Sequence, residues 1–219
     1  YAGVMFSRGL RKLAVAYDVR NRSFSESWLN EFRTAFSRLG GTLATETAFE
    51  ALPDAGFADV VGKLVASNPD GLVFIASAID VARLAQQARK QAPALPLGAS
   101  EWAASEQILE LGGKSVEGLL IVQSWDRSDE SPRYRAFHDA YLKRFQREPG
   151  YSSVAAYDAA IVAFSAMGKR ASGESVKAAV LKNGPYEGLQ QQIIFDANGD
   201  TTRKVFFTEI HGGQFVLVK

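Results

Sequence analysis

The sequence contains no cysteine, only two histidines and no long apolar run, and each shortage excludes a kind of protein. Without cysteine there are no disulfides, no thiolate nucleophile and no cysteine-ligated zinc. His138 and His211 lie far apart in unrelated contexts, so we predict no metal site and no cofactor. No apolar run approaches the roughly 20 residues that span a bilayer. The chain starts without a signal-peptide pattern, and we expect any export signal to have been removed already.

The chain also lacks an excess of charge of either sign. The chain of 219 residues has 25 lysines and arginines against 24 acidic residues, a formal net charge of +1. This balance removes the general argument for nucleic acid or an anionic membrane as a partner. With 47% hydrophobic residues, the chain can bury a sizeable core, either as one large domain or as two lobes.

Glycine is absent from the first polar loop, within "VAYDVRNRSFSESWLNEF" at residues 15–32. No glycine occurs between Arg11 and Leu39, so neither phosphate-loop pattern, GxGxxG or GxxxxGK[ST], is possible there. The GxSxG pattern of a serine nucleophile is missing from the whole chain, and neither histidine is a credible base. Ser23 and Glu26 instead fit a capping box. Because a capped helix start after a parallel strand can also bind ligands, that role stays open.

Apolar strand-like segments alternate with helix-period segments over the first half of the chain. Leu29, Phe32 and Phe36, for example, recur at helical spacing between two such strands. This alternation predicts an α/β fold with βαβ units and a parallel sheet. The predicted strands are Lys12–Tyr17, Thr42–Phe49, Gly71–Ala76, Leu95–Ala99 and Val116–Val122.

From Ser131 the pattern becomes mainly helical and then closes with strands. It predicts helices over Pro132–Phe145, Ser153–Met167 and near Ser175–Leu181, and a final hairpin around the turn "HGG". The hairpin strands are predicted at Lys204–Ile210 and Gln214–Val218. We therefore predict three segments: 10–125 with five parallel strands, 126–190 with helices, and 191–219 with the last strands and the hairpin.

Carboxylates follow several of the predicted strands. Asp18, Asp80, Glu101 and Asp126 should gather at one sheet edge, because the carboxyl ends of parallel strands meet there. Asp80 is predicted to cap the next helix, and Asp126 is either a turn or a hinge residue. Glu101 precedes Trp102, and an aromatic ring beside a carboxylate can anchor a small ligand.

Two further motifs each have two interpretations. "FDANGD" begins like a calcium loop at Asp196, but Thr201 replaces the required glycine and Phe207 the required glutamate, which favours a β-turn. In "GYSSVAAYDAA", Ser153 could cap a helix with Tyr157 in the core. Alternatively, Tyr151 and the two serines lie at a cleft.

The order of these pieces resembles the branched-chain amino-acid (leucine/isoleucine/valine-binding) receptors of ABC importers, which are type I periplasmic solute-binding proteins. The resemblance runs through "KLAVAYDVRNRSFSESWLNEFRTAFSRLGG", "FADVVGKLVASNPDGLVFIASAIDVARLAQQAR", "LPLGASEW", "GGKSVEGLLIVQSW", "YRAFHDAYLKRFQREPGYSSVAAYDAA" and "IIFDANGD". It implies a periplasmic, non-catalytic receptor whose two lobes close on a small ligand and deliver it to an ABC permease in the membrane.

Members of that family have a first lobe before the strand that begins here at Lys12. The resemblance therefore implies a second lobe, with segment 126–190 returning to the first. The opening helix at Tyr1–Phe6 needs partners. We expect the helices from Pro132 to Met167 to pack on a second copy of the chain or on a separate first-lobe fragment, because monomers rarely expose large apolar faces.

The resemblance also implies a set of ligand contacts. Phe24 takes the place of an aromatic residue in the first loop, and Ser100 and Glu101 lie where an acidic residue meets a ligand ammonium group. The implied ligand-binding residues are Ser23, Phe24, Ser77, Ala78, Ser100, Glu101, Trp102, Tyr151 and Ser152. The ligand would be an amino acid, an amide or an aromatic carboxylate, and Phe24, Trp102 and Trp125 favour an aromatic or amide compound. The alternatives are a sensor domain of the same fold and a flavodoxin-like or Rossmann-like enzyme.

Overall fold

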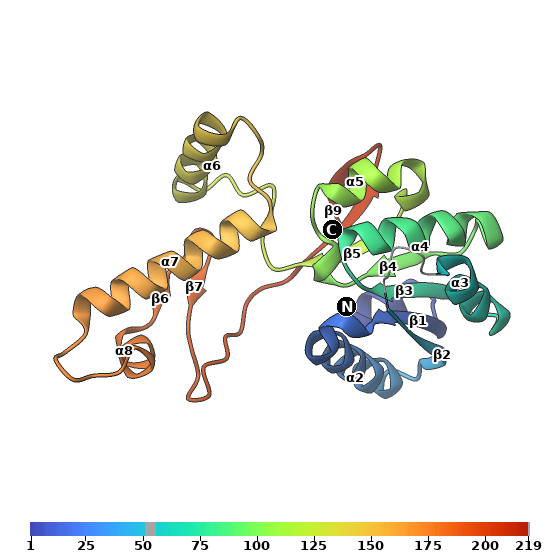
Figure 1. The fold of residues 1–219 in the computed structure, drawn as a ribbon, viewed down its shortest axis with the longest axis horizontal. Coiled ribbons are helices and arrows are strands. Elements are labelled where there is room, and N and C mark those ends of the chain that lie inside the picture. The colour runs from blue at the N-terminus through green and yellow to red at the C-terminus, as the bar shows by residue number, and fades with distance from the viewer. Residues whose placement is uncertain (51–55, 219) are drawn as a thin grey trace. The chain divides into compact units, whose positions relative to one another are not determined.

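The structure, a computed structural model, describes residues 1–50 and 56–218. Its internal contacts divide the chain into two compact units (Figure 1). Unit 1 comprises Tyr1–Val122 with Phe207–Lys219, and unit 2 comprises Gln123–Phe206. The final hairpin, which the sequence groups with segment 191–219, thus belongs to unit 1.

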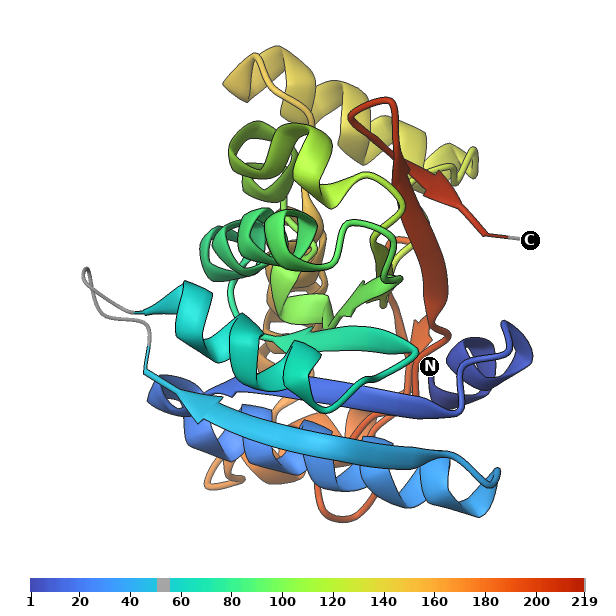
Figure 2. The same ribbon diagram turned by 90° about the vertical axis from the view of Figure 1, so that its right-hand side faces the viewer.

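A seven-stranded sheet forms the centre of unit 1, in the order β2-β1-β3-β4-β5-β8-β9. The first five strands pair in parallel, whereas β8 and β9 form an antiparallel hairpin. Figure 2 shows β1 and β2 running side by side. The strands are β1 (Lys12–Asp18), β2 (Thr42–Phe49), β3 (Gly71–Ile75), β4 (Leu97–Ala99), β5 (Leu120–Gln123), β8 (Phe206–His211) and β9 (Gln214–Leu217). The predicted α/β fold with a mostly parallel sheet is confirmed.

Helices cover both faces of this sheet, so its central strands are apolar throughout (Figure 1). Successive residues of β1 point to opposite faces: Leu13 and Val15 pack with α1 and α2, whereas Ala14 and Ala16 pack with α3 and α4. The helices of unit 1 are α1 (Ala2–Ser7), η1 (Val19–Asn21), α2 (Arg22–Arg38), α3 (Phe57–Ala66), α4 (Ala78–Gln91), η2 (Glu101–Ala103), α5 (Gln107–Gly112) and η3 (Gly113–Val116).

The opening helix α1 finds its partners within unit 1. The Tyr1 ring lies 5.6 Å from the Trp28 ring and 5.9 Å from the Phe32 ring, and Met5 is 2% exposed. Burial raises the pKa of the Tyr1 phenol, which stays protonated and donates to the Leu120 carbonyl at 3.0 Å. The first residues therefore form part of the core of unit 1.

Unit 2 consists of helices and two very short strands. Its elements are α6 (Pro132–Phe145), α7 (Tyr151–Lys169), α8 (Val176–Asn183), β6 (Tyr186–Glu187) and β7 (Gln192–Ile193). One apolar cluster joins α7, α8 and the β6–β7 pair around Tyr186 and Ile193, and another gathers around Trp125 and Tyr134. Asp158, 3% exposed, accepts a hydrogen bond from the Leu189 backbone at 2.8 Å and ties α7 to the following loop.

The predicted capping box at Ser23 is wrong. The side chain of Asp18 accepts a hydrogen bond from the Arg20 backbone at 2.9 Å, which starts a 3-10 turn directly after β1. Helix α2 therefore begins at Arg22 without a side-chain cap, and Ser23 and Phe24 lie in its first turn rather than in a loop. Glu26 pairs with Arg22 at 3.3 Å.

Other boundaries also differ from the prediction, among them the strand predicted at Leu95–Ala99, which begins at Leu97, and the one predicted at Lys204–Ile210, which is Phe206–His211. Ser77, not Asp80, caps α4, and its hydroxyl accepts from the Asp80 backbone. Ser153 does not cap α7, because the helix starts at Tyr151, after Gly150. The Ser153 hydroxyl instead donates to the Tyr141 oxygen at 2.9 Å. The strand predicted from Val116 starts at Leu120, because a 3-10 turn and Gly118, with a φ of +73°, intervene.

The "FDANGD" motif is a turn, as predicted. Asp196 accepts three hydrogen bonds of 2.9 Å, from the backbone of Asn198, Gly199 and Asp200. Over residues 1–50 and 56–218, no group of acidic or histidine side chains is arranged to hold a metal ion. In the same ranges, no helix has both the length and the hydropathy needed to cross a membrane.

Candidate functional site

The carboxyl ends of β1, β3 and β4 form one edge of the sheet in unit 1. These strands are neighbours in register, with Tyr17 opposite Ile75 and Phe74 opposite Ala99. Each strand leads into a helical element, so the first residues of η1, α4 and η2 meet at this edge. Ligands of open α/β sheets bind at such an edge. The residues predicted from sequence lie close to these starts: 23–24 in the first turn of α2, which follows η1, 77–78 at the start of α4, and 100–102 at the start of η2.

Two aromatic side chains and a carboxylate meet there. The rings of Phe24 and Trp102 contact edge to face, with centroids 5.7 Å apart. Trp28, one turn further along α2, donates from its indole nitrogen to Glu101 Oε2 at 2.9 Å. This bond fixes the Glu101 carboxylate, while its Oε1 accepts no hydrogen bond from the residues that the structure describes. The group can therefore offer an aromatic surface and an anionic acceptor to one small molecule.

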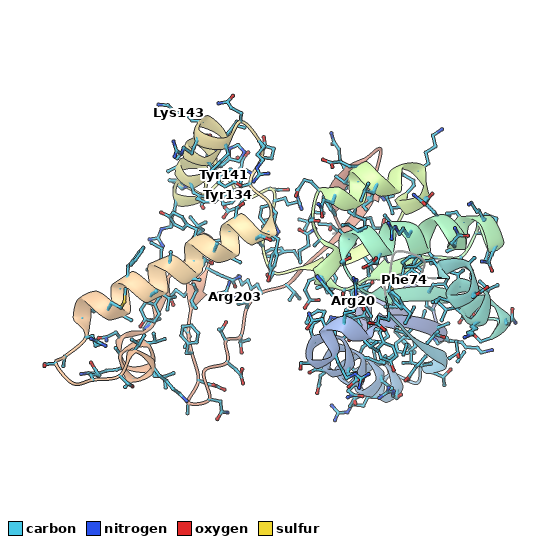
Figure 3. All side chains as sticks on the ribbon, in the orientation of Figure 1. Arg20, Phe74, Tyr134, Tyr141, Lys143 and Arg203 are labelled. Atoms are coloured by element: carbon cyan, nitrogen blue, oxygen red, sulfur yellow. The ribbon has the colours of Figure 1, made fainter. Side chains whose placement is uncertain are left out.

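A second cluster at the same edge centres on Arg20 (labelled in Figure 3). Its Nε and Nη2 donate to Asp18 Oδ2 at 2.9 and 2.6 Å, and Nη2 also donates to Asp80 Oδ2 at 2.6 Å. The Ser77 hydroxyl donates to the same Asp80 oxygen at 2.7 Å. The hydrogen bonds to Asp18, followed by the charges of Asp18 and Asp80, raise the pKa of Arg20. The guanidinium is thus fixed in one orientation.

The two acids of this cluster were predicted from the sequence to lie at the sheet edge, but the arginine that joins them was not. Asp18 is completely buried and Asp80 is 4% exposed, and buried carboxylates need hydrogen-bonded partners. The partner of both is Arg20, whose side chain is 42% exposed. The available signal was the spacing Asp18-x-Arg20 directly after a buried strand, with a second acid near the end of the neighbouring strand.

Two of the other four predicted residues of unit 1 are buried. Ala78 is 4% exposed and packs in the core, so its methyl group points away from solvent. Ser100 is fully buried, and its hydroxyl has no hydrogen-bond partner within the described ranges. Ser23 is exposed in the first turn of α2, and Ser77 is half-buried at the cap of α4. Of these four, Ser23 and Ser77 present side chains at the surface.

Tyr151 and Ser152 belong to unit 2, at the start of α7. Ser152 is exposed, whereas Tyr151 is half-buried and lines a small cavity of about 10 Å³ with Trp125 and Asp158. Trp125 is 3% exposed, and its indole nitrogen has no partner in the described part of the chain. A ligand role for Tyr151 and Ser152 stays a prediction.

Unit 1 also contains a cavity of about 520 Å³ at the opposite end of the sheet, near the starts of β4 and β5. Size alone would favour it as a binding site. However, its polar groups are already occupied: Arg8 pairs with Glu209, and Arg89 donates to backbone carbonyls of Pro93, Leu95 and Glu117. The carboxyl edge, which retains an unoccupied carboxylate oxygen and an exposed guanidinium, is the better candidate.

Several solved structures of solute-binding proteins have a similar fold. The leucine-binding protein LivK of Thermotoga maritima is 23% identical, with a TM-score of 0.91, and the match covers 100% of this chain and 63% of that chain. LivJ of Streptococcus pneumoniae, solved with isoleucine, is 22% identical, with a TM-score of 0.83 and coverage of 98% and 62%. A solute-binding protein of R. palustris, solved with benzoate, is 16% identical, with a TM-score of 0.85 and coverage of 99% and 60%.

The chain therefore spans less than two thirds of the length of these three structures. Comparison with curated protein sequences gave no match. The family model described as "Periplasmic binding protein" matches residues 1–214, which is nearly the whole chain. On this match, together with the fold of unit 1, the chain belongs to the periplasmic binding protein family.

Proposed function

We propose that this protein binds a small organic solute (an amino acid, an amide or an aromatic carboxylate) and delivers it to an ABC permease from the periplasm. The observation that carries this proposal is the Phe24–Trp102 pair beside Glu101 at the carboxyl edge of the sheet. The related structures support it, since they include a leucine-binding protein and proteins solved with isoleucine and with benzoate.

Binding without catalysis is the activity that we propose. The family consists of binding proteins. The side chains at the edge are held by one another: Arg20 by two carboxylates, and Glu101 by the Trp28 indole. Such mutual hydrogen bonds orient groups for recognition. The two histidines lie elsewhere, at exposed positions on α6 and at the end of β8.

Each group at the edge has a proposed role in recognition. The edge-to-face aromatic pair provides an apolar surface for a ring or an aliphatic side chain. Glu101 Oε1 would accept a hydrogen bond from a ligand ammonium or amide nitrogen. Glu101 takes this role rather than Ser100, whose side chain is fully buried. Ser77 and Ser23 would contribute hydroxyl groups at the margin.

Calorimetric titration with leucine, phenylalanine, benzoate and benzamide tests the proposal. We expect at least one compound to bind, and we expect Trp102→Ala to weaken binding by about tenfold or more, since a buried aromatic contact contributes on the order of 1.5 kcal/mol. Phe145→Ala, at a 53% exposed aromatic in unit 2, is the matched control and should leave affinity unchanged. Binding of none of the compounds by the folded chain would contradict the proposed function. Tight binding of leucine without binding of the aromatic compounds would overturn only the expected preference for aromatic or amide ligands, and solute binding would stand.

A further inference from the structure

One edge of the Arg20 guanidinium, at Nη1, donates no hydrogen bond to the described residues. Nε and Nη2 make every hydrogen bond of this side chain, to Asp18 and Asp80. Nη1 donates to no group among residues 1–50 and 56–218, although the side chain is 42% exposed. Two N–H groups therefore face outward from a guanidinium whose other edge is fixed. A rigid, unoccupied donor at a sheet edge is suited to hold one ligand acceptor in a defined position.

The charges around Arg20 determine which acceptor it prefers. One guanidinium is balanced against two carboxylates, so the cluster carries a formal charge of −1. Glu101, at the same edge, adds a further negative charge. A ligand carboxylate at Nη1 would meet one positive and at least two negative charges, and it would also lose its hydration. An uncharged carbonyl or hydroxyl oxygen could accept the same hydrogen bonds without that repulsion.

We propose that Arg20 is a specificity-determining residue that donates from Nη1 to an uncharged oxygen of the ligand, and that this site selects an amide or hydroxyl compound over the matching carboxylate. The inference rests on the proposed function and narrows its ligand class. Asp18 and Asp80 are positioning residues in this arrangement: they orient the guanidinium and cancel its attraction for anions. Ser77 supports Asp80 through the 2.7 Å hydrogen bond.

The inference predicts the same change in ligand preference for two substitutions, by two different routes. Arg20→Lys keeps a positive charge between the buried acids but removes the outward N–H pair, so amide binding should weaken by about tenfold. Asp80→Asn removes one negative charge and leaves Arg20 paired with Asp18, so carboxylates should bind better relative to amides. A purely structural role of the cluster would weaken both members of each ligand pair alike.

The experiment is calorimetric titration of the whole chain with three matched pairs: benzamide and benzoate, phenylalaninamide and phenylalanine, and leucinamide and leucine. We expect the wild type to prefer the amide in the pair that binds. The ratio of amide to carboxylate affinity should fall in both Arg20→Lys and Asp80→Asn, through weaker amide binding in the first and stronger carboxylate binding in the second. Arg22→Lys is the matched control, because the side chain of this neighbouring arginine is 67% exposed and, among the described residues, forms an ion pair with Glu26 alone.

The outcomes separate this inference from the proposed function. A wild type that binds the carboxylate more tightly, or a ratio unchanged by both substitutions, overturns the role of Arg20 while solute binding stands. A folded wild type that binds none of the six compounds overturns the proposed function and this inference with it. Circular dichroism of each variant establishes that it is folded, and Asp80→Asn provides the test if Arg20→Lys does not fold.

Discussion

Arg20 illustrates how single side chains determine both stability and recognition at the carboxyl edge. It is the common partner of Asp18, the last residue of β1, and Asp80, in the first turn of α4. Removing one partner of a buried ionic cluster leaves charge without compensation, which costs far more than losing an exposed ion pair. The stability of this edge should therefore depend strongly on one partly exposed residue.

We expect Arg20→Gln to lower the free energy of unfolding by about 3 kcal/mol, because it leaves two buried carboxylates without their cation. Arg22→Gln makes the same chemical change at an exposed ion pair and should cost less than about 1 kcal/mol. Urea unfolding of both variants measures the difference. Equal losses in the two variants would show that Arg20 does not compensate the buried acids.

At the scale of elements, the first three strands were predicted well, whereas helix starts were predicted unevenly: α6 begins at Pro132 as predicted, but α2 does not begin after a cap at Ser23. β2 matches its predicted bounds, and β1 and β3 each differ by one residue. β1 and β3 are buried along most of their length and carry a continuous apolar signal, whereas β2 is a partly exposed edge strand. The start of α2 was missed because Asp18 begins a helical turn by accepting from Arg20, which displaces the capping box at Ser23. Local motifs could not reveal this competition.

The candidate site was predicted in the same uneven way. Phe24, Glu101 and Trp102 lie at the expected edge, because parallel strands bring their carboxyl ends together. The Trp28–Glu101 and Arg20–Asp80 contacts join residues 73 and 60 positions apart, and no spacing rule connects them. Burial of Ala78 and Ser100 likewise depends on packing that the sequence pattern does not specify.

The contact of α1 with β4 provides a test of packing between elements. A Cβ atom at Gly98 would overlap the Tyr1 hydroxyl and lie 3.0 Å from Met5 Cε. We expect Gly98→Ala to destabilise the protein by about 1–3 kcal/mol through overpacking. Gly3→Ala within α1 meets no atom within 4 Å and should be neutral or stabilising by up to about 1 kcal/mol. Thermal unfolding compares them, and a neutral Gly98→Ala would contradict the described position of α1.

The β8–β9 hairpin should be more stable at lower pH within the range in which histidine titrates. Hydrogen bonds to Glu209 and Glu117 raise the pKa of His211, so the folded state holds this proton more tightly than the unfolded state. The stabilisation is complete below the ordinary histidine pKa of about 6.5 and is lost as pH rises through the raised value. We therefore expect His211→Gln to lower the urea midpoint more at about pH 6 than at about pH 8. The same loss at both values would exclude this linkage.

At the scale of the whole molecule, unit 2 leaves much apolar surface exposed. Phe164 is 68% exposed, Phe145 53% and Met167 49%, and an apolar hollow of about 430 Å³ lies between α6 and α7, lined by Phe137 and Tyr157. Such surfaces mark sites of association when they are contiguous. We propose that these apolar surfaces of unit 2 pack on a second copy of the chain or on a separate first-lobe fragment.

This exposure leads us to expect concentration-dependent self-association of the chain. Sedimentation velocity over a wide range of protein concentration should show a rising mean mass, and Phe164→Ser should reduce it. Glu31→Gln, on the exposed side of α2 in unit 1, is a control that should not. A compact monomer at every concentration would contradict the proposal that a second copy of the chain covers these faces, and would leave the separate first-lobe fragment as the cover.

The central claim, that a small solute binds at the carboxyl edge of the sheet in unit 1, can be tested most directly by NMR. The chain has three tryptophans, and two of them, Trp28 and Trp102, lie at this edge, where Trp28 donates to Glu101 and Trp102 contacts Phe24. We predict that the compound that binds most tightly in calorimetry shifts the indole N–H signals of both. Saturation of the protein with that compound while both signals stay in place would contradict the account.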